Sequence, residues 1–110
     1  MKKIINTEKS PAPIGPYNQA ILKDNMLFIS GQIGLEPISM KLNNNSIEDE
    51  TNQVMINLKH ILKEANMDFG NVVKTSIFLS DMDLFKKVND IYGKYIIEGN
   101  EPVRETIAVK

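Results

Sequence analysis

The 110-residue chain contains no cysteine, which excludes a disulfide framework, a thiol nucleophile and a thiolate metal site. It has a single histidine, His60, so no second imidazole is available to complete a transition-metal site. Acidic loops of the calcium-binding type and glycine-rich nucleotide-binding loops are also missing from the sequence. We therefore expect a function that uses no metal and no cofactor.

No stretch approaches the run of about 18 apolar residues that spans a membrane, and the apolar part of residues 1–6 is too short for a signal-peptide core. The net charge of −1 and the lack of clustered Lys and Arg argue against a nucleic-acid partner, because affinity for phosphate backbones rests on such clusters. We expect a cytoplasmic protein without a membrane or nucleic-acid partner.

The composition, with 42% hydrophobic and 25% charged residues, is typical of one soluble globular domain over residues 1–110. A domain of this size buries only roughly 65% of the surface of its unfolded chain. Its stability is therefore expected to be marginal unless subunits associate.

Hydrophobic patterns predict five strands and two helices in the order β-β-β-α-β-α-β, an α+β fold. Crossover helices in such a chain most simply lie on one face of a single mixed sheet. The expected strands cover residues 3–5, 17–22, 26–33, 72–79 and 103–109, and the expected helices cover residues 47–65 and 82–95.

The first expected helix has a clear start at Ser46, a plausible N-cap that is followed by three acidic residues. Acidic residues in a first turn are more typical of a match to the helix dipole than of a paired acid/base site. On the helical wheel His60 lies far from the apolar stripe, so we expect it to face water.

Two expected strands carry large apolar residues on both faces, with Phe28 opposite Leu27 and Phe78 opposite Ile77. Two helices can cover only one face of the sheet, so the other face needs a different cover. A cyclic homo-oligomer that packs these open faces together is the simplest solution. It would bring Arg104 and Ser30 near subunit boundaries if they point away from the helices.

Arg104 is the main functional candidate, because it stands in an otherwise apolar strand with Thr106 on the same face. A guanidinium stays charged and offers a planar fork of donors that matches a carboxylate, so a half-buried one is a candidate anion clamp. The alternative is a solvated arginine on an edge strand, where its charge discourages other strands from pairing with the sheet, and spacing alone favours this alternative.

Other polar candidates are weaker when taken singly. Tyr17 follows a Gly-Pro pair, and the pattern alone is more typical of a buried aromatic with a satisfied hydroxyl. Ser30 precedes Gly31 and could mark a bulge, and Asn89 borders the apolar stripe of the second helix, where a structural hydrogen bond is an open alternative.

Several segments together resemble the RidA/YjgF/YER057c/UK114 family of small trimeric proteins. The segment APIGPYNQA looks like the family's N-terminal signature, and FISGQI looks like its third strand. Four more segments keep the family's order and spacing, so the resemblance spans essentially the whole chain. They are NQVMINLK at residues 52–59, VVKT at 72–75, VNDIY at 88–92 and PVR at 102–104.

The resemblance implies a chorismate-mutase-like fold and a homotrimer with active sites between subunits. Such sites hydrolyse reactive 2-imino acids, such as 2-iminobutanoate and 2-iminopropanoate, to 2-oxo acids and ammonia. By analogy Arg104 clamps the substrate carboxylate and a backbone group at Thr106 contacts the imine end. The remaining implied substrate-binding residues are Tyr17, Ser30, Gly31, Ile33 and Asn89.

One departure from the family pattern concerns the C-terminal side. Family members usually continue through a Leu-Pro turn into a final strand with a glutamate thought to position the attacking water, whereas this sequence ends at Lys110. In the family fold that strand pairs in the middle of the sheet, so its loss would leave two strands with open edges. We expect a single RidA-like domain over residues 1–110 that lacks this final strand, because the sequence is incomplete or the C-terminal segment was lost. A non-catalytic metabolite-binding or regulatory trimer is then the alternative, and translation inhibition through RNA cleavage ranks lower.

Overall fold

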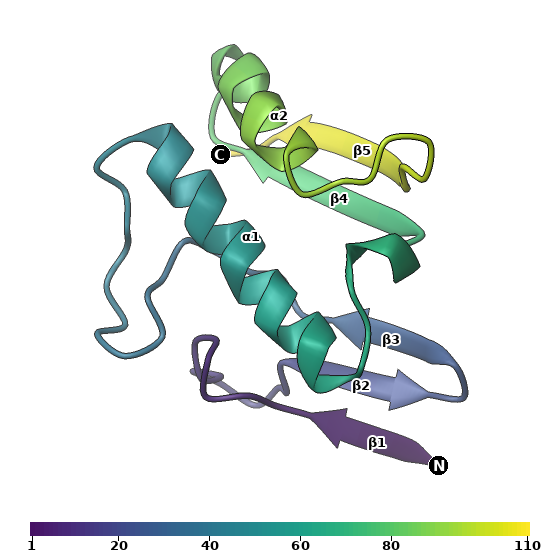
Figure 1. Ribbon diagram of the computed structural model, residues 1–110. Helices are drawn as coiled ribbons and strands as arrows, with labels where there is room; N and C mark the ends of the chain where they lie inside the picture. The colour runs from purple at the N-terminus through teal and green to yellow at the C-terminus, as the bar shows by residue number, and fades with distance from the viewer.

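The computed structural model describes residues 1–110 and has the predicted element order β-β-β-α-β-α-β (Figure 1). Short 3₁₀ turns at Phe69–Asn71 and Met82–Leu84 precede β4 and α2. The elements are β1 Lys2–Ile5, β2 Ala20–Lys23, β3 Met26–Ile29, α1 Ile47–Glu64, β4 Lys74–Leu79, α2 Phe85–Gly93 and β5 Val103–Ala108.

The strands form two sheets instead of the single sheet expected from the sequence. β1, β2 and β3 make an antiparallel sheet, and β4 and β5 make a parallel pair. The β2–β3 hairpin turns at two residues, and Asp24 adopts the left-handed conformation that such turns require, with φ 56°. β2 and β3 are shorter than predicted. Before β2, Gln19 N donates to the side chain of Asn6, and after β3, Ile33 O accepts from the side chain of Asn57.

The two sheets face each other across strand edges that carry unpaired backbone groups. Hydrogen-bonded pairs alternate along an antiparallel ladder, and Ser30 N donates to Gln19 O, so the polar groups of Leu27 and Ile29 point away from β2. Val73 O accepts from Val103 N, so the backbone groups of Val73 and of every second residue after it point toward β5. The backbone groups of Ser76 therefore point toward the opposite edge of β4. α1 runs past both sheets and is the element that bridges them (Figure 1).

The start of α1 is confirmed as predicted. Ser46 has an extended backbone and its Oγ accepts a hydrogen bond of 3.0 Å from Asp49 N. The helix packs its apolar face on the first sheet, where Ile61 is fully buried against Ile5 and Ala20. These three side chains form the centre of the core.

α2 is shorter than predicted and ends at Gly93. Asp81 accepts from Asp83 N and caps the 3₁₀ turn that leads into it. Val88 and Tyr92 are its buried residues, and the Tyr92 hydroxyl lies 2.8 Å from Thr75 Oγ1 on β4. This contact ties the helix to the second sheet.

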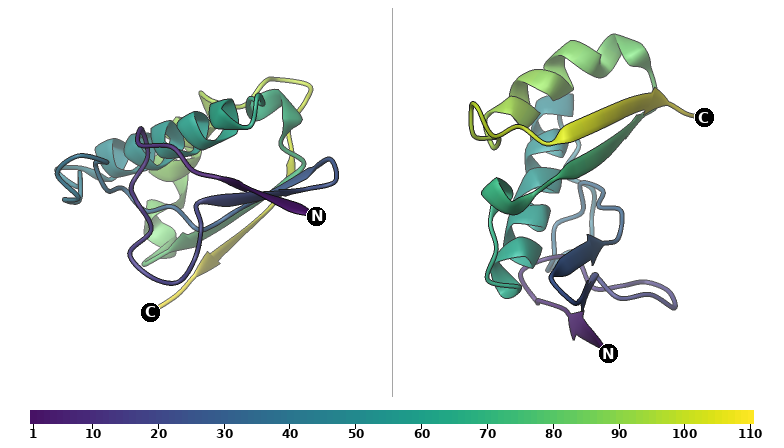
Figure 2. Two further views of the ribbon diagram at one scale, coloured as in Figure 1. Left: turned by 90° about the horizontal axis from the view of Figure 1, so that it is seen from below. Right: turned by 90° about the vertical axis from the view of Figure 1, so that its right-hand side faces the viewer.

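Both helices lie on the same side of the strands, as predicted (Figure 2). The opposite side exposes large apolar side chains from both sheets, including Phe28 at 60%, Phe78 at 61% and Val103 at 68% of their full surface. Monomeric proteins rarely leave an apolar surface of this extent open to water. This open face is the main surface of the chain without a cover.

None of the helices has the length and the apolar character that a membrane-spanning segment needs.

His60 is only partly exposed, whereas the helical wheel predicted that it faces water. Its Nδ1 atom is buried without a hydrogen-bond partner. Burial lowers the pKa of the imidazole below its ordinary value, and the positive charges of Lys9, Lys59 and Lys63 lower it further. The prediction failed because the wheel considers only the helix, whereas the loop at residues 7–10 packs onto this side of α1 through the hydrogen bond from Ser10 Oγ to Asn57 O.

Candidate functional site

Arg104 lies on β5 and points toward α2, on the helix-covered side of the second sheet. Its guanidinium carbon lies 5.5 Å from the ring centre of Phe85 and 5.2 Å from that of Tyr92, distances typical of cation–π contacts. The sequence raised the possibility that Arg104 points away from the helices, and the structure excludes it. The side chain is nevertheless exposed, because β5 is an edge strand.

The guanidinium is held by neutral groups and keeps its charge available. Arg104 Nη1 donates a hydrogen bond of 2.6 Å to Asn89 Oδ1. The one ion pair within 4.0 Å in the molecule joins Lys74 and Glu105, so no carboxylate of this chain neutralises Arg104. A cation that is oriented but not neutralised suits a ligand carboxylate.

A cavity of about 630 Å³ lies beside Arg104, between α2 and the loop that leads into β5. Asn89 lines it too, so the structure brings together two of the predicted site residues. The full lining consists of Asn89, Tyr92, Gly93, Ile96, Glu98, Glu101, Pro102 and Arg104.

The backbone of Thr106 is free to bind a ligand at the outer edge of β5. Val103 N donates to Val73 O at 3.0 Å and Val109 N donates to Leu79 O at 2.8 Å. In a parallel pair alternate residues of a strand bond to the same neighbour, so the N–H and C=O of Thr106 point away from β4. No other strand pairs with β5, and these groups have no backbone partner.

A second, smaller hollow of about 210 Å³ lies at the other sheet and contains three more predicted site residues, Tyr17, Gly31 and Ile33. It shares no residue with the Arg104 cavity. Within one chain the predicted site is therefore divided into two parts. The lining comprises Pro11, Ala12, Ile14, Tyr17, Gln19, Gly31, Gln32, Ile33 and Leu35.

Tyr17 and Ser30 differ in their exposure and in the hydrogen bonds that they already make. The Tyr17 side chain is 48% exposed, and its hydroxyl accepts from Ile14 N at 3.3 Å, so it is not a buried aromatic. Ser30 Oγ donates to Asn18 O at 2.6 Å and its N–H donates to Gln19 O. Ser30 lines neither hollow, and it fixes the backbone that presents Tyr17.

Two buried amides support this part of the site, and sequence reasoning missed both. Gln19, 2% exposed, accepts from Thr7 N and donates to Thr7 O, Ser10 O and Pro11 O. Asn57 on α1 is fully buried and donates to Ile33 O at 3.2 Å and to Leu35 O at 2.9 Å. Polarity alone places such residues on the solvent side, and only their positions in the family-like segments gave a signal.

The comparisons with known proteins agree on one family. The model of the family described as Endoribonuclease L-PSP matches residues 7–110. The chain belongs to this family. It is 46% identical over 109 residues to the 2-iminobutanoate/2-iminopropanoate deaminase of Mus musculus, and the match covers 99% of this chain and 80% of the mouse protein.

Two further family members extend the comparison. The chain is 46% identical to the Reactive Intermediate Deaminase A, chloroplastic, of Arabidopsis thaliana, with 98% of this chain covered and only 57% of the plant protein. The crystal structure of a protein of the conserved Rid family from Yersinia pestis superposes with a TM-score of 0.95 at 38% identity, covering 99% of this chain and 86% of that one. The chorismate-mutase-like α+β fold expected from the sequence is therefore confirmed as the fold of this family.

Proposed function

We propose that the protein hydrolyses reactive 2-imino acids to 2-oxo acids and ammonia, with 2-iminobutanoate and 2-iminopropanoate as the first candidates. The observation that carries this proposal is the oriented but un-neutralised guanidinium of Arg104 beside an open hollow that admits a small acid. The name of the mouse relative, a 2-iminobutanoate/2-iminopropanoate deaminase, supports the same substrate class.

In this proposal Arg104 binds the substrate carboxylate through two parallel N–H donors, and Asn89 keeps the guanidinium in place. The free backbone groups of Thr106 contact the imine end of the substrate. An imine carbon is already electrophilic, so orientation beside a water molecule and stabilisation of developing charge supply the catalysis without a covalent nucleophile.

We further propose that the working site forms between subunits of a homotrimer. One chain holds Arg104 and Asn89 in one hollow and Tyr17, Gly31 and Ile33 in another, and a neighbouring subunit can bring the two kinds of hollow together. Ser30 does not line the second hollow and supports it by fixing the backbone next to Tyr17 through its bond to Asn18 O. The uncovered apolar face supports association, because contact between subunits removes it from water. Arg104 lies on the helix-covered side, so in this proposal it meets the neighbouring subunit at the outer edge of β5 and not across the apolar face.

The direct test adds the purified protein to a threonine dehydratase reaction, which releases 2-iminobutanoate, and measures the rate at which ammonia and 2-oxobutanoate appear. We expect the rate of appearance to increase with the concentration of the protein. An unchanged rate, together with saturable binding of 2-oxobutanoate in calorimetry, would instead support a non-catalytic metabolite binder.

RNA cleavage, which the family description names, has less support in this chain. Phosphodiester cleavage commonly uses paired acid/base groups, and this chain has a single histidine, whose Nδ1 is buried. The net charge of −1 also gives little attraction for a polyanion. Incubation with labelled RNA is expected to leave it intact.

Phe78→Asp should dissociate the assembly. The residue lies on the open face of β4, and burying an unpaired carboxylate in a subunit interface costs several kcal/mol. Sedimentation velocity is expected to show trimers for the unmodified protein and monomers for the variant. Ile38→Asp, at a 97% exposed loop residue, serves as the matched control and should remain trimeric. A monomeric unmodified protein would contradict the proposal.

A cytoplasmic location stays a prediction from the sequence. The Arabidopsis relative is named as chloroplastic, so the compartment differs among family members. Fractionation of the source cells checks it.

A further inference from the structure

The Arg104 cavity contains charges of both signs. Its charged lining residues are Arg104, Glu98 and Glu101, and neither glutamate lies within ion-pair distance of the guanidinium. Opposite charges that share a cavity without pairing leave both available to a ligand. The cavity therefore suits a small molecule that carries a negative and a positive group at the same time.

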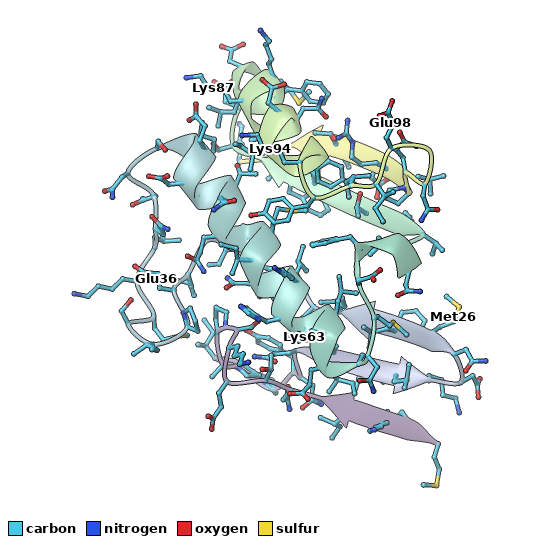
Figure 3. The ribbon with its side chains drawn as sticks, in the orientation of Figure 1. Met26, Glu36, Lys63, Lys87, Lys94 and Glu98 are labelled. Carbon is cyan, nitrogen blue, oxygen red and sulfur yellow. The ribbon has the colours of Figure 1, made fainter.

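Glu101 is the better placed of the two carboxylates. Its Oε1 accepts from Gly99 N at 3.1 Å, which leaves Oε2 free, and the following Pro102 restricts the backbone. The neighbouring Asn100 anchors the loop by donating to Gly70 O at 3.0 Å. Glu98 lies on the same loop, beside β5 (Figure 3). Its carboxylate has no hydrogen-bond partner to hold it in one position.

The ligand chemistry follows from the proposed function, on which this inference rests. A protonated 2-imino acid carries a carboxylate and a positive iminium nitrogen, whereas the 2-oxo acid product carries only the carboxylate. The reaction is R₂C=NH₂⁺ + H₂O → R₂C=O + NH₄⁺, so the positive charge leaves with ammonium and atoms and charge balance. Only the substrate has a group that a second, negative residue can attract.

We propose that Glu101 is a specificity-determining residue that favours the iminium form of the substrate over the 2-oxo acid product. Its carboxylate attracts the positive nitrogen while Arg104 holds the carboxylate end. The negative charge of Glu101 does not attract the neutral carbonyl of the product. It also reduces the electrostatic attraction between the cavity and the product, whose only charge is negative. Glu101 thereby promotes release of the product as well as selection of the substrate.

The test compares Glu101→Gln with the unmodified full chain in the coupled dehydratase assay. For the variant we expect kcat/KM for 2-iminobutanoate to fall about fivefold. The inhibition constant of 2-oxobutanoate should also fall about fivefold, meaning tighter product binding. A change of about fivefold is the upper range for solvent-exposed charge pairs, and both Glu101 and Arg104 are exposed. The variant should therefore use the substrate less efficiently but bind the product more tightly. A merely structural defect would weaken the interaction with the substrate and with the product. Glu64→Gln, at an exposed residue of α1, removes the same charge elsewhere and should change neither value.

The outcomes separate this inference from the proposed function. If the unmodified protein does not accelerate imine hydrolysis, the proposed function fails. If it does, but Glu101→Gln leaves both constants unchanged or weakens both, the assignment to Glu101 is overturned. If Glu98→Gln alone produces the expected pair of shifts, the residue is Glu98 and the assignment is likewise overturned.

Discussion

Arg104→Ala should lower kcat/KM for 2-iminobutanoate hydrolysis on the order of a hundredfold. Truncating one partner of a hydrogen-bonded charge pair typically costs about 2 to 5 kcal/mol, and each 1.4 kcal/mol is about a tenfold change. The guanidinium has no partner carboxylate within ion-pair distance, so the substitution breaks no internal ion pair. Steady-state kinetics of ammonia release measures the effect.

Arg104→Lys is the informative companion variant. Lysine keeps the positive charge but loses the planar fork and stacks less well between Phe85 and Tyr92, so we expect an intermediate loss. Lys87→Ala, at an exposed residue of α2, controls for the loss of one positive charge and should retain full activity. Unaltered kinetics of Arg104→Ala in an intact assembly would rule out the carboxylate clamp.

Asn57→Ala should lower the free energy of unfolding by about 3 kcal/mol. The variant removes the amide that donates to Ile33 O and Leu35 O and that accepts from Gln53 Nε2. Each buried polar group left without a partner costs about 1 to 3 kcal/mol. Urea denaturation followed by circular dichroism measures the change.

The same variant should also weaken activity, because Asn57 holds the loop that carries Ile33 into the second hollow. Asn52→Ala is the matched control on the same helix. Asn52 is exposed and accepts only from the Tyr95 hydroxyl, so its loss should stay well under 1 kcal/mol. Equal destabilisation by both variants would show that the buried amide has no special role.

Local signals in the sequence predicted the parts of the fold that depend on neighbouring residues. Ser46 followed by acidic residues marked the start of α1, because an N-cap satisfies donors only a turn away. The alternation around Arg104 correctly placed it on the face shared with Thr106, because side-chain direction in a strand follows a period of two.

Contacts between distant segments could not be predicted in this way. The burial of Gln19 and Asn57 depends on loops eight or more residues away, whose backbone carbonyls need hydrogen-bond donors. A local sequence pattern gives no information about that requirement. Likewise the division of the strands into two sheets depends on whether β3 and β4 pair, which is a non-local property. The resemblance to a family supplied the candidate site residues that periodicity could not, such as Tyr17 and Gly31.

The unpaired edges of β3 and β4 affect how readily the protein aggregates. β3 consists of Met26, Leu27, Phe28 and Ile29, without a charged or proline residue that would discourage another strand from adding to it. Such a segment can recruit the same segment of other copies into a growing cross-β stack. We therefore expect the protein to stay in solution only at low concentration. Aggregation on storage, seen as turbidity, would start at these four residues.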